Sequence, residues 1–146
     1  AALESARIER PTDLPAAFAQ LAGQLRRRSV VVLISDLLAD AGEVIRAIEQ
    51  IRYNRHDVVV MHLLDHDERT FPFQDQTLFE GIEQAGVELF TDPPALRAAY
   101  LMAVDEFVRR VRTACVNHRV DFVDLSTSDS LDIVLRRYLT ARAAVR

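Results

Sequence analysis

Polar side chains that could bind or react with a ligand follow three apolar segments of the chain. Ser35 and Asp36 come directly after residues 30–34, the segment DHDE (65–68) follows a second apolar run, and STSD (126–129) follows a third. In open α/β sheets, ligands bind beyond the carboxyl ends of the strands, where loops lead into helices. The same residue types also shape turns and cap helices. The three segments are candidate site residues, and turn or capping chemistry is the simpler interpretation of each.

The other reactive side chains give weak support for an enzyme. The segment HLLDHDE (62–68) contains metal-ligand types, but its spacing matches no compact zinc pattern, and His62 on an apolar strand is typical of a core histidine. Cys115 lies on the apolar stripe of a predicted helix, which indicates a core thiol. A small hydrolase or phosphotransfer protein that uses Asp36 remains the alternative. Neither a nucleophile elbow nor an organised His–carboxylate pair supports it.

Composition and charge narrow the classes of protein further. All 18 basic residues are arginines, so no lysine can form a Schiff base or hold a phosphate. The net charge of -4 disfavours nucleic acid as a partner. Apolar runs of about five residues fall far short of the roughly 20 that cross a bilayer, so no membrane span is expected. With one cysteine and no apparent signal peptide, a cytoplasmic location is expected.

Alternating helices and strands must position the candidate residues. Apolar side chains at helical spacing predict four helices, over about residues 13–25, 40–51, 93–115 and 131–139. Continuous apolar runs predict strands over residues 30–34, 58–64 and 120–125. Two shorter strands, 77–82 and 87–91, predict an inserted β-hairpin with a turn at Gly86.

This order predicts one domain over residues 1–146, with a three-layer, Rossmann-like α/β fold and a mostly parallel sheet. The run over residues 30–34 does not alternate between apolar and polar side chains. Such a run is expected of a strand that helices cover on both faces. The basic run RRR (26–28) is interpreted as cations near a helix C-terminus.

Several motifs together resemble one protein family. The segment ERPTDLPAAFAQLAGQLRRRSVVVLISDLLAD and the later DPPALRAAY and TSDSLDIVLRRYLTAR resemble the C-terminal part of the bacterial "domain of unknown function 58" family. The resemblance runs from about Ile8 to the end of the chain. Those proteins carry a von Willebrand factor A-like domain. The resemblance therefore implies such a fold, in a fragment from which the first strands of the full domain are absent.

The resemblance also implies a metal-ion-dependent adhesion site. In such domains, an Asp-x-Ser-x-Ser motif, a threonine from a later loop and an aspartate after the fourth strand together bind a divalent ion. Thr12 in PTDL matches the threonine, Asp36 in ISDL matches the aspartate, and Ser35 is a possible helper. The first motif has no match, because DLSTSD (124–129) has similar spacing but follows the last strand. A partial site is expected, with Mg²⁺ or Mn²⁺ in a full-length parent and none bound by this chain.

Members of this family often sit beside genes for a MoxR-type AAA+ ATPase. The resemblance therefore implies a non-enzymatic interaction or adaptor domain that works with such an ATPase in protein assembly or chaperone-like work, although the parent could be membrane-tethered. A purely structural domain with a dead metal site is a further alternative. Without an inner neighbour, the strand over residues 30–34 would have an unpaired edge, so dimerisation or strand exchange through it is expected.

Overall fold

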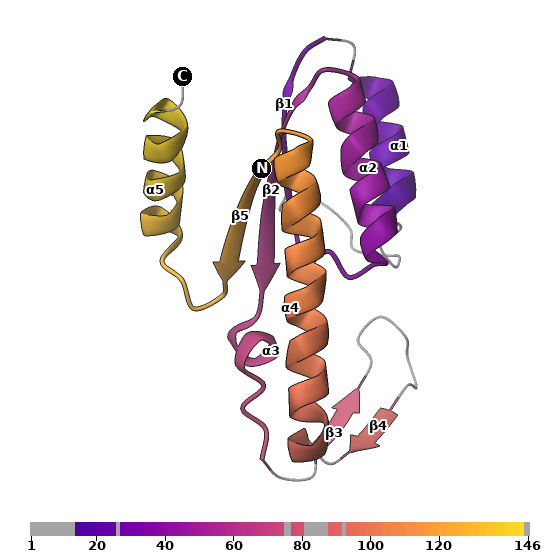
Figure 1. Ribbon diagram of the computed structural model, residues 1–146, viewed down its shortest axis with the longest axis vertical. Coiled ribbons are helices and arrows are strands. Elements are labelled where there is room, and N and C mark those ends of the chain that lie inside the picture. The colour runs from indigo at the N-terminus through magenta and orange to yellow at the C-terminus, as the bar shows by residue number, and fades with distance from the viewer. Residues whose placement is uncertain (1–13, 26, 75–76, 81–87, 92, 145–146) are drawn as a thin grey trace, which may run out of the picture.

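Three parallel strands form the central sheet of the molecule (Figure 1). This structure is a computed structural model, and it describes residues 14–25, 27–74, 77–80, 88–91 and 93–144. The strands β1 (Val30–Ser35), β2 (Asp57–Leu64) and β5 (Asp121–Ser126) lie in the order β1-β2-β5. In the described part of the chain, β2 is thus the central strand and β1 and β5 are the edges.

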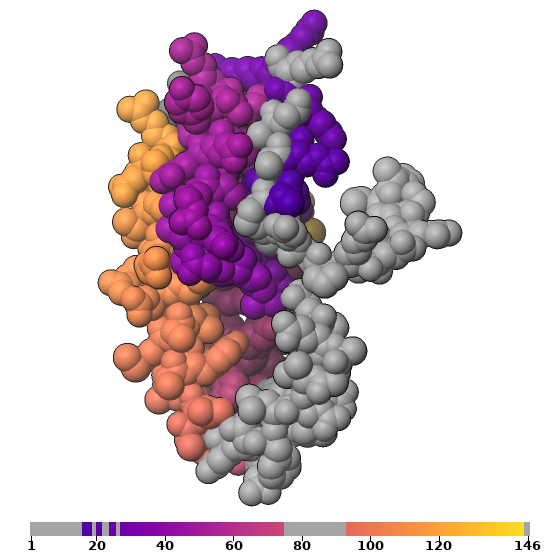
Figure 2. Space-filling model, turned by 90° about the vertical axis from the view of Figure 1, so that its right-hand side faces the viewer, coloured from indigo at the N-terminus to yellow at the C-terminus, as the bar shows by residue number. Residues whose placement is uncertain are grey.

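Helices lie on both faces of this sheet, which confirms the predicted α/β class. On one face are α1 (Leu14–Gln24), α2 (Ala41–Tyr53) and α4 (Pro93–Asn117), and on the other is α5 (Leu131–Ala144). In Figure 2, α2 lies between α1 and α4 on the side that faces the viewer. None of the described helices is both long and apolar enough to cross a membrane.

The main core lies between the sheet and α1, α2 and α4, a side we call the covered face. Val31 of β1 and Val58 and Val60 of β2 point into it. The helices contribute five fully buried side chains, namely Val44, Ile48, Ile51, Val111 and Cys115. Asp40 caps α2, because its Oδ1 accepts hydrogen bonds from the Gly42 and Glu43 N–H groups at 2.8 and 3.2 Å. The cap therefore fixes the start of α2 directly before Ala41, the first of its buried residues.

The opposite side of the sheet, which we call the open face, is covered only in part. α5 packs over β2 and β5, where Val59, Met61 and Leu125 contact Leu135 and Tyr138. One helix is about 10 Å wide and strands lie about 4.8 Å apart, so one helix covers about two strands. β1 is the third strand, and α5 does not reach across it.

The prediction that helices cover both faces of β1 is therefore wrong. Val30, Val32 and Ile34 are 60, 49 and 63% exposed, whereas Val31 between them is buried. An apolar run predicts a strand that can be buried on both faces, but the helices that pack against the strand decide whether it is.

A short helix and a hairpin lie between β2 and α4 in the chain. β3 (Thr77–Glu80) and β4 (Glu88–Thr91) pair antiparallel, which confirms the predicted hairpin; the predicted turn at Gly86 lies outside the described residues. The segment DHDE is not simply a loop, because α3 (His66–Thr70) begins there with a capping box between Asp65 and Glu68.

Candidate functional site

Loops at the carboxyl ends of β2 and β5 are joined by hydrogen bonds. The Thr127 hydroxyl donates to Asp65 Oδ2 at 2.8 Å, and the His66 N–H donates to Thr127 Oγ1 at 3.1 Å. Asp65 Oδ1 also accepts a hydrogen bond from the Asp67 N–H. The bond from Asp67, and after it the bond from Thr127, lower the pKa of Asp65. Asp129 Oδ2 accepts from the Ser126 N–H at 2.8 Å. The structure therefore confirms a helix cap in the first segment and a turn in the second.

Ser35 and Asp36 shape their own loop. The Leu38 N–H donates to Asp36 Oδ1 at 3.2 Å, the Leu37 N–H donates to Ser35 Oγ at 3.0 Å, and the Ser35 hydroxyl donates to Asp36 Oδ1 at 3.3 Å. These bonds hold Leu37 at φ 58°, in the left-handed region, and its side chain is fully buried. The loop contacts therefore anchor Leu37 in the core, and among the described residues no hydrogen bond joins this loop to those after β2 and β5.

A divalent-ion site is not complete among the described residues. Asp36 is exposed and supplies one carboxylate, and the Ser35 hydroxyl, 3.3 Å from Asp36 Oδ1, could supply a second oxygen. Thr12, the other predicted ligand, lies outside the described residues. Elsewhere in the described ranges, no group of three or more acidic, histidine or cysteine side chains could hold a metal ion. Because Mg²⁺ requires six oxygen ligands, these residues by themselves do not fit an all-protein site.

An organised His–carboxylate pair lies on the covered face, contrary to the sequence-based expectation. His62 Nδ1 is 3.1 Å from Asp124 Oδ1, and the Arg69 guanidinium donates to both carboxylate oxygens at 2.7 and 3.2 Å. Arg112 adds a bond at 3.2 Å. Burial opposes ionisation of Asp124, but the bonds from His62 and Arg69 and the charge of Arg69 hold the pKa of Asp124 well below its usual range.

The contacts of the His62–Asp124 pair are those of a structural group in the core. His62 is buried between Phe107 and Phe122, as expected of a core histidine. Ser35 and Asp124 are its partners in the sheet register, so the three side chains lie in one row on the covered face. The Ser35 hydroxyl, however, bonds to its own loop, so the row does not form a nucleophile–base hydrogen bond. Cys115 is also a core thiol, and burial raises its pKa to about 11.

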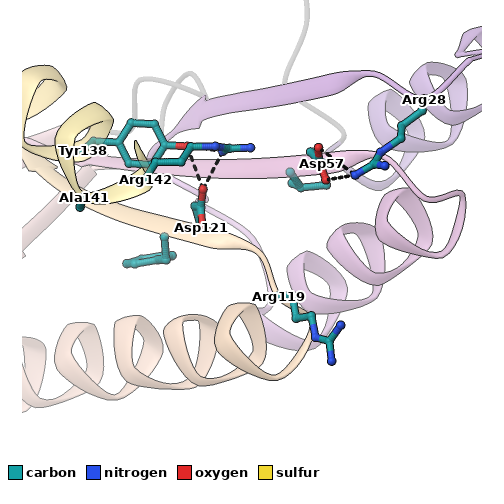
Figure 3. Close-up of a pocket in the computed structure, with 9 residues that line it drawn as sticks. Arg28, Asp57, Arg119, Asp121, Tyr138, Ala141 and Arg142 are labelled. Atoms are coloured by element: carbon teal, nitrogen blue, oxygen red, sulfur yellow. Dashed lines mark hydrogen bonds and ion pairs between the residues drawn. The ribbon is translucent and has the colours of Figure 1, made fainter. Parts of the chain in front are cut away.

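A second polar region lies at the opposite, amino end of the strands. A cavity of about 460 Å³ there is lined by Arg28, Asp57, Asp121, Tyr138 and Arg142, among others. In Figure 3, the Arg28–Asp57 pair and the group formed by Arg142, Tyr138 and Asp121 lie at the starts of β2 and β5. Arg28 lies beyond the last turn of α1, so the interpretation of RRR as helix-terminal cations is wrong for this residue.

An apolar groove separates β1 from α5 on the open face, and we call it the open groove. Its volume is about 740 Å³. The sheet contributes Val30, Val32, Val59 and Met61, and α5 contributes Leu135, Tyr138, Leu139, Arg142 and Ala143. The sequence analysis did not predict this groove, although it predicted that the strand over residues 30–34 would have an unpaired edge. Tyr138 and Arg142 also line the amino-end cavity, so the groove and the cavity adjoin.

Comparison with known proteins bears on the predicted family. The family model described as "Protein of unknown function DUF58" matches residues 2–110. No curated protein and no solved structure matches the chain. The matched range includes β1, β2 and most of α4, which is well over half of the 146 residues. The chain therefore belongs to the DUF58 family of proteins of unknown function, as its motifs had predicted.

Proposed function

We propose that this chain is a protein-interaction domain without enzymatic activity. We propose further that its partner binds to the open groove and to the open face of β1. The observation that carries this proposal is the exposure of Val30, Val32 and Ile34 side by side on one strand. Single exposed apolar residues are ordinary, but a contiguous row beside an apolar groove marks an interaction site. Covering each side chain would contribute on the order of 1 kcal/mol.

The polar chemistry of the molecule supports binding rather than catalysis. Asp124 is engaged by two arginines and a histidine, and His62 is buried, so neither is presented to a substrate. Ser35 and Asp36 serve the loop that buries Leu37. The groove, by contrast, is open and is lined mainly by apolar side chains.

The proposed partner is a MoxR-type AAA+ ATPase, and the proposed work is protein assembly or chaperone-like. Family membership supports this partner, through the gene neighbourhood that the resemblance implies. A second copy of the chain is the competing occupant, because β1 is an edge strand in the described sheet and unpaired edges favour association.

The direct test is a binding titration between the purified chain and a purified MoxR-type ATPase from the same genome. We expect Val32→Asp to weaken binding at least 10-fold, because it places a charge in the apolar surface. Val116→Asp is the matched control, since Val116 is an exposed valine on α4, away from the groove; we expect it to change binding less than 2-fold. Absence of binding by the wild type, or equal binding by Val32→Asp, would contradict the proposal.

Divalent ions have a minor place in this proposal. Asp36 and Ser35 could contribute two oxygen atoms, with water or a partner's carboxylate as the remaining ligands. We expect calorimetric titration of the isolated chain with Mg²⁺ or Mn²⁺ to show weak binding at most. A sub-micromolar site that Asp36→Ala abolishes would show that a complete ion site exists.

A further inference from the structure

We infer that three arginines beside the end of α2 form a binding site for a phosphate group. Arg28, Arg52 and Arg55 line a hollow of about 690 Å³ at the amino ends of β1 and β2, and Asn54 is the other residue that lines it. None of these four side chains is acidic. The inference goes beyond the proposed function, because the hollow shares no lining residue with the open groove.

The charges around the hollow do not balance. Asp57 pairs with two of the arginines through one oxygen atom, because its Oδ1 lies 3.3 Å from Arg28 Nη2 and 3.7 Å from Arg52 Nη1. Arg55 is exposed, and its guanidinium forms no hydrogen bond or ion pair among the described residues. Three arginines against one aspartate leave a surplus of two positive charges at the hollow.

The three guanidiniums also retain donors for a ligand. Arg52 donates through Nε and Nη1 to two backbone carbonyl oxygens, at 3.1 and 2.9 Å, so its guanidinium is held in place and its Nη2 remains available. Arg28 bonds to Asp57 through Nη2, which leaves its Nη1 and Nε. All the donors of Arg55 are free within the described part of the chain. The hollow therefore combines one fixed arginine with two that can adjust to a ligand.

The backbone at Arg55 places this side chain beside the hollow at a cost in stability. Arg55 has φ 63°, in the left-handed region, where helices usually end on glycine because a Cβ strains this conformation. Asn54, a residue type that tolerates the region better, stands one position earlier at φ -75°. Arg119 after α4 has φ 55°, so strain by itself marks no site. Arg55 differs from Arg119 because two further arginines line the same hollow.

A phosphate group matches this arrangement better than a carboxylate does. A phosphate monoester carries about -1.5 to -2 charges at pH 7 and three strong acceptor oxygens, and arginine donates to it in a fork geometry. Its charge therefore balances the surplus, and its oxygens can accept from all three arginines. A carboxylate has one charge and two oxygens, and Asp57 already supplies one without balancing the arginines. The dipole of α2 favours cations near the helix end, but it provides no acceptor for the unused donors.

The first test is calorimetric titration of the full chain with inorganic phosphate, near neutral pH and at low chloride. Acetate is the control anion, because it has a single charge and two oxygens. We expect phosphate to bind at least 10-fold more tightly than acetate. Raising the salt concentration should weaken phosphate binding, because the guanidiniums are partly exposed. Equal affinities for phosphate and acetate would overturn the inference, because they would mean that the arginines attract any anion.

Two glycine substitutions separate the site from the backbone strain. Arg55→Gly removes a guanidinium from the hollow and relieves the left-handed strain, so it should weaken phosphate binding at least 5-fold while it raises the urea denaturation midpoint. Arg119→Gly relieves the same strain, but Arg119 does not line the hollow and in Figure 3 lies apart from Arg28 and Asp57. It should raise the midpoint and change phosphate affinity less than 2-fold. Equal phosphate affinities of the two variants would overturn the inference.

Vesicles that contain phosphatidic acid distinguish the two sources of a phosphate group. If the chain sediments with these vesicles and Arg55→Gly does not, the phosphate belongs to a lipid headgroup. If the chain binds inorganic phosphate but does not sediment with the vesicles, the ligand is a soluble phosphate compound. Both results support the site, whereas a wild-type chain that binds neither probe would contradict it. The outcome is independent of the proposed partner, because Val32→Asp should leave phosphate affinity within 2-fold of the wild type.

Discussion

The two faces of β1 carry the same kind of side chain and have opposite environments. Val31 points to the covered face and is 8% exposed, while Val32 points to the open face and is 49% exposed. The difference comes from the helices, because α1, α2 and α4 pack against one face and α5, alone among the described helices, packs against the other. Apolar composition sets which residues can form a core, and the supply of covering elements sets which residues do.

Polar groups follow the same division. On the covered face, Asp124 is paired with the buried His62 and with Arg69 and Arg112, a group that we call the Asp124 centre. The open face adjoins the amino-end cavity, where arginines outnumber carboxylates. The charges of the Asp124 centre are thus paired within the chain, whereas the arginines at the amino-end cavity exceed their acidic partners among the described residues.

The largest predicted effect is on the stability that the Asp124 centre provides. Asp124→Asn should lower the free energy of unfolding by roughly 3 kcal/mol, because two arginines and His62 lose the charge that they surround. Asp132→Asn is the matched control, since Asp132 forms an exposed pair with Arg136 on α5; we expect a change within about 0.5 kcal/mol. Urea denaturation measures the free energy of unfolding of both variants. Similar effects of the two substitutions would contradict a stabilising role of the Asp124 centre.

A smaller effect should distinguish the two faces of β1 directly. Thr has nearly the shape of Val, so Val31→Thr buries a hydroxyl in the apolar core and should cost about 1–3 kcal/mol. Val32→Thr leaves the hydroxyl in water and should change stability by no more than about 0.5 kcal/mol. Equal losses, measured from urea denaturation midpoints, would mean that the open face of β1 is covered in solution.

The smallest predicted effect is on the pH dependence of the free energy of unfolding. Because the pKa of Asp124 is depressed by folding, its ionised form contributes stability above the unfolded pKa of about 3.9, and this contribution is lost as the pH falls below that value. The stability difference between the wild type and Asp124→Asn should therefore narrow as the pH falls below about 4. Denaturation at a series of pH values tests this, and a constant difference would exclude a depressed pKa.

Much of the fold could be predicted from periodicity. The strand at residues 58–64 and the helix that begins at Pro93 lie where the apolar pattern placed them. The short helix α3 was missed, because five residues are too few for helical periodicity to register. Its capping residues were visible, but Asp and Glu at that spacing also occur in turns.

The sites were harder to predict than the elements. His62 and Asp124 are 62 residues apart and meet because β2 and β5 pair in that register, which no local pattern reports. The open groove likewise depends on the position of α5 across the sheet. The role of Asp36 could be predicted in part, because its place after β1 indicated a turn, and its hydrogen bond to Leu38 forms one.

The most direct test of the central claim, that the open face of β1 binds a partner protein, is the reactivity of a thiol placed there. Cys115 is buried and its pKa is raised to about 11, so the wild type provides an unreactive background. Val32→Cys and the control Val116→Cys should both react rapidly with a maleimide in the free chain. Saturation with the MoxR-type ATPase should slow the reaction of Val32→Cys at least 10-fold and leave that of Val116→Cys unchanged. Equal reactivity of Val32→Cys in the free and the saturated chain would contradict the claim.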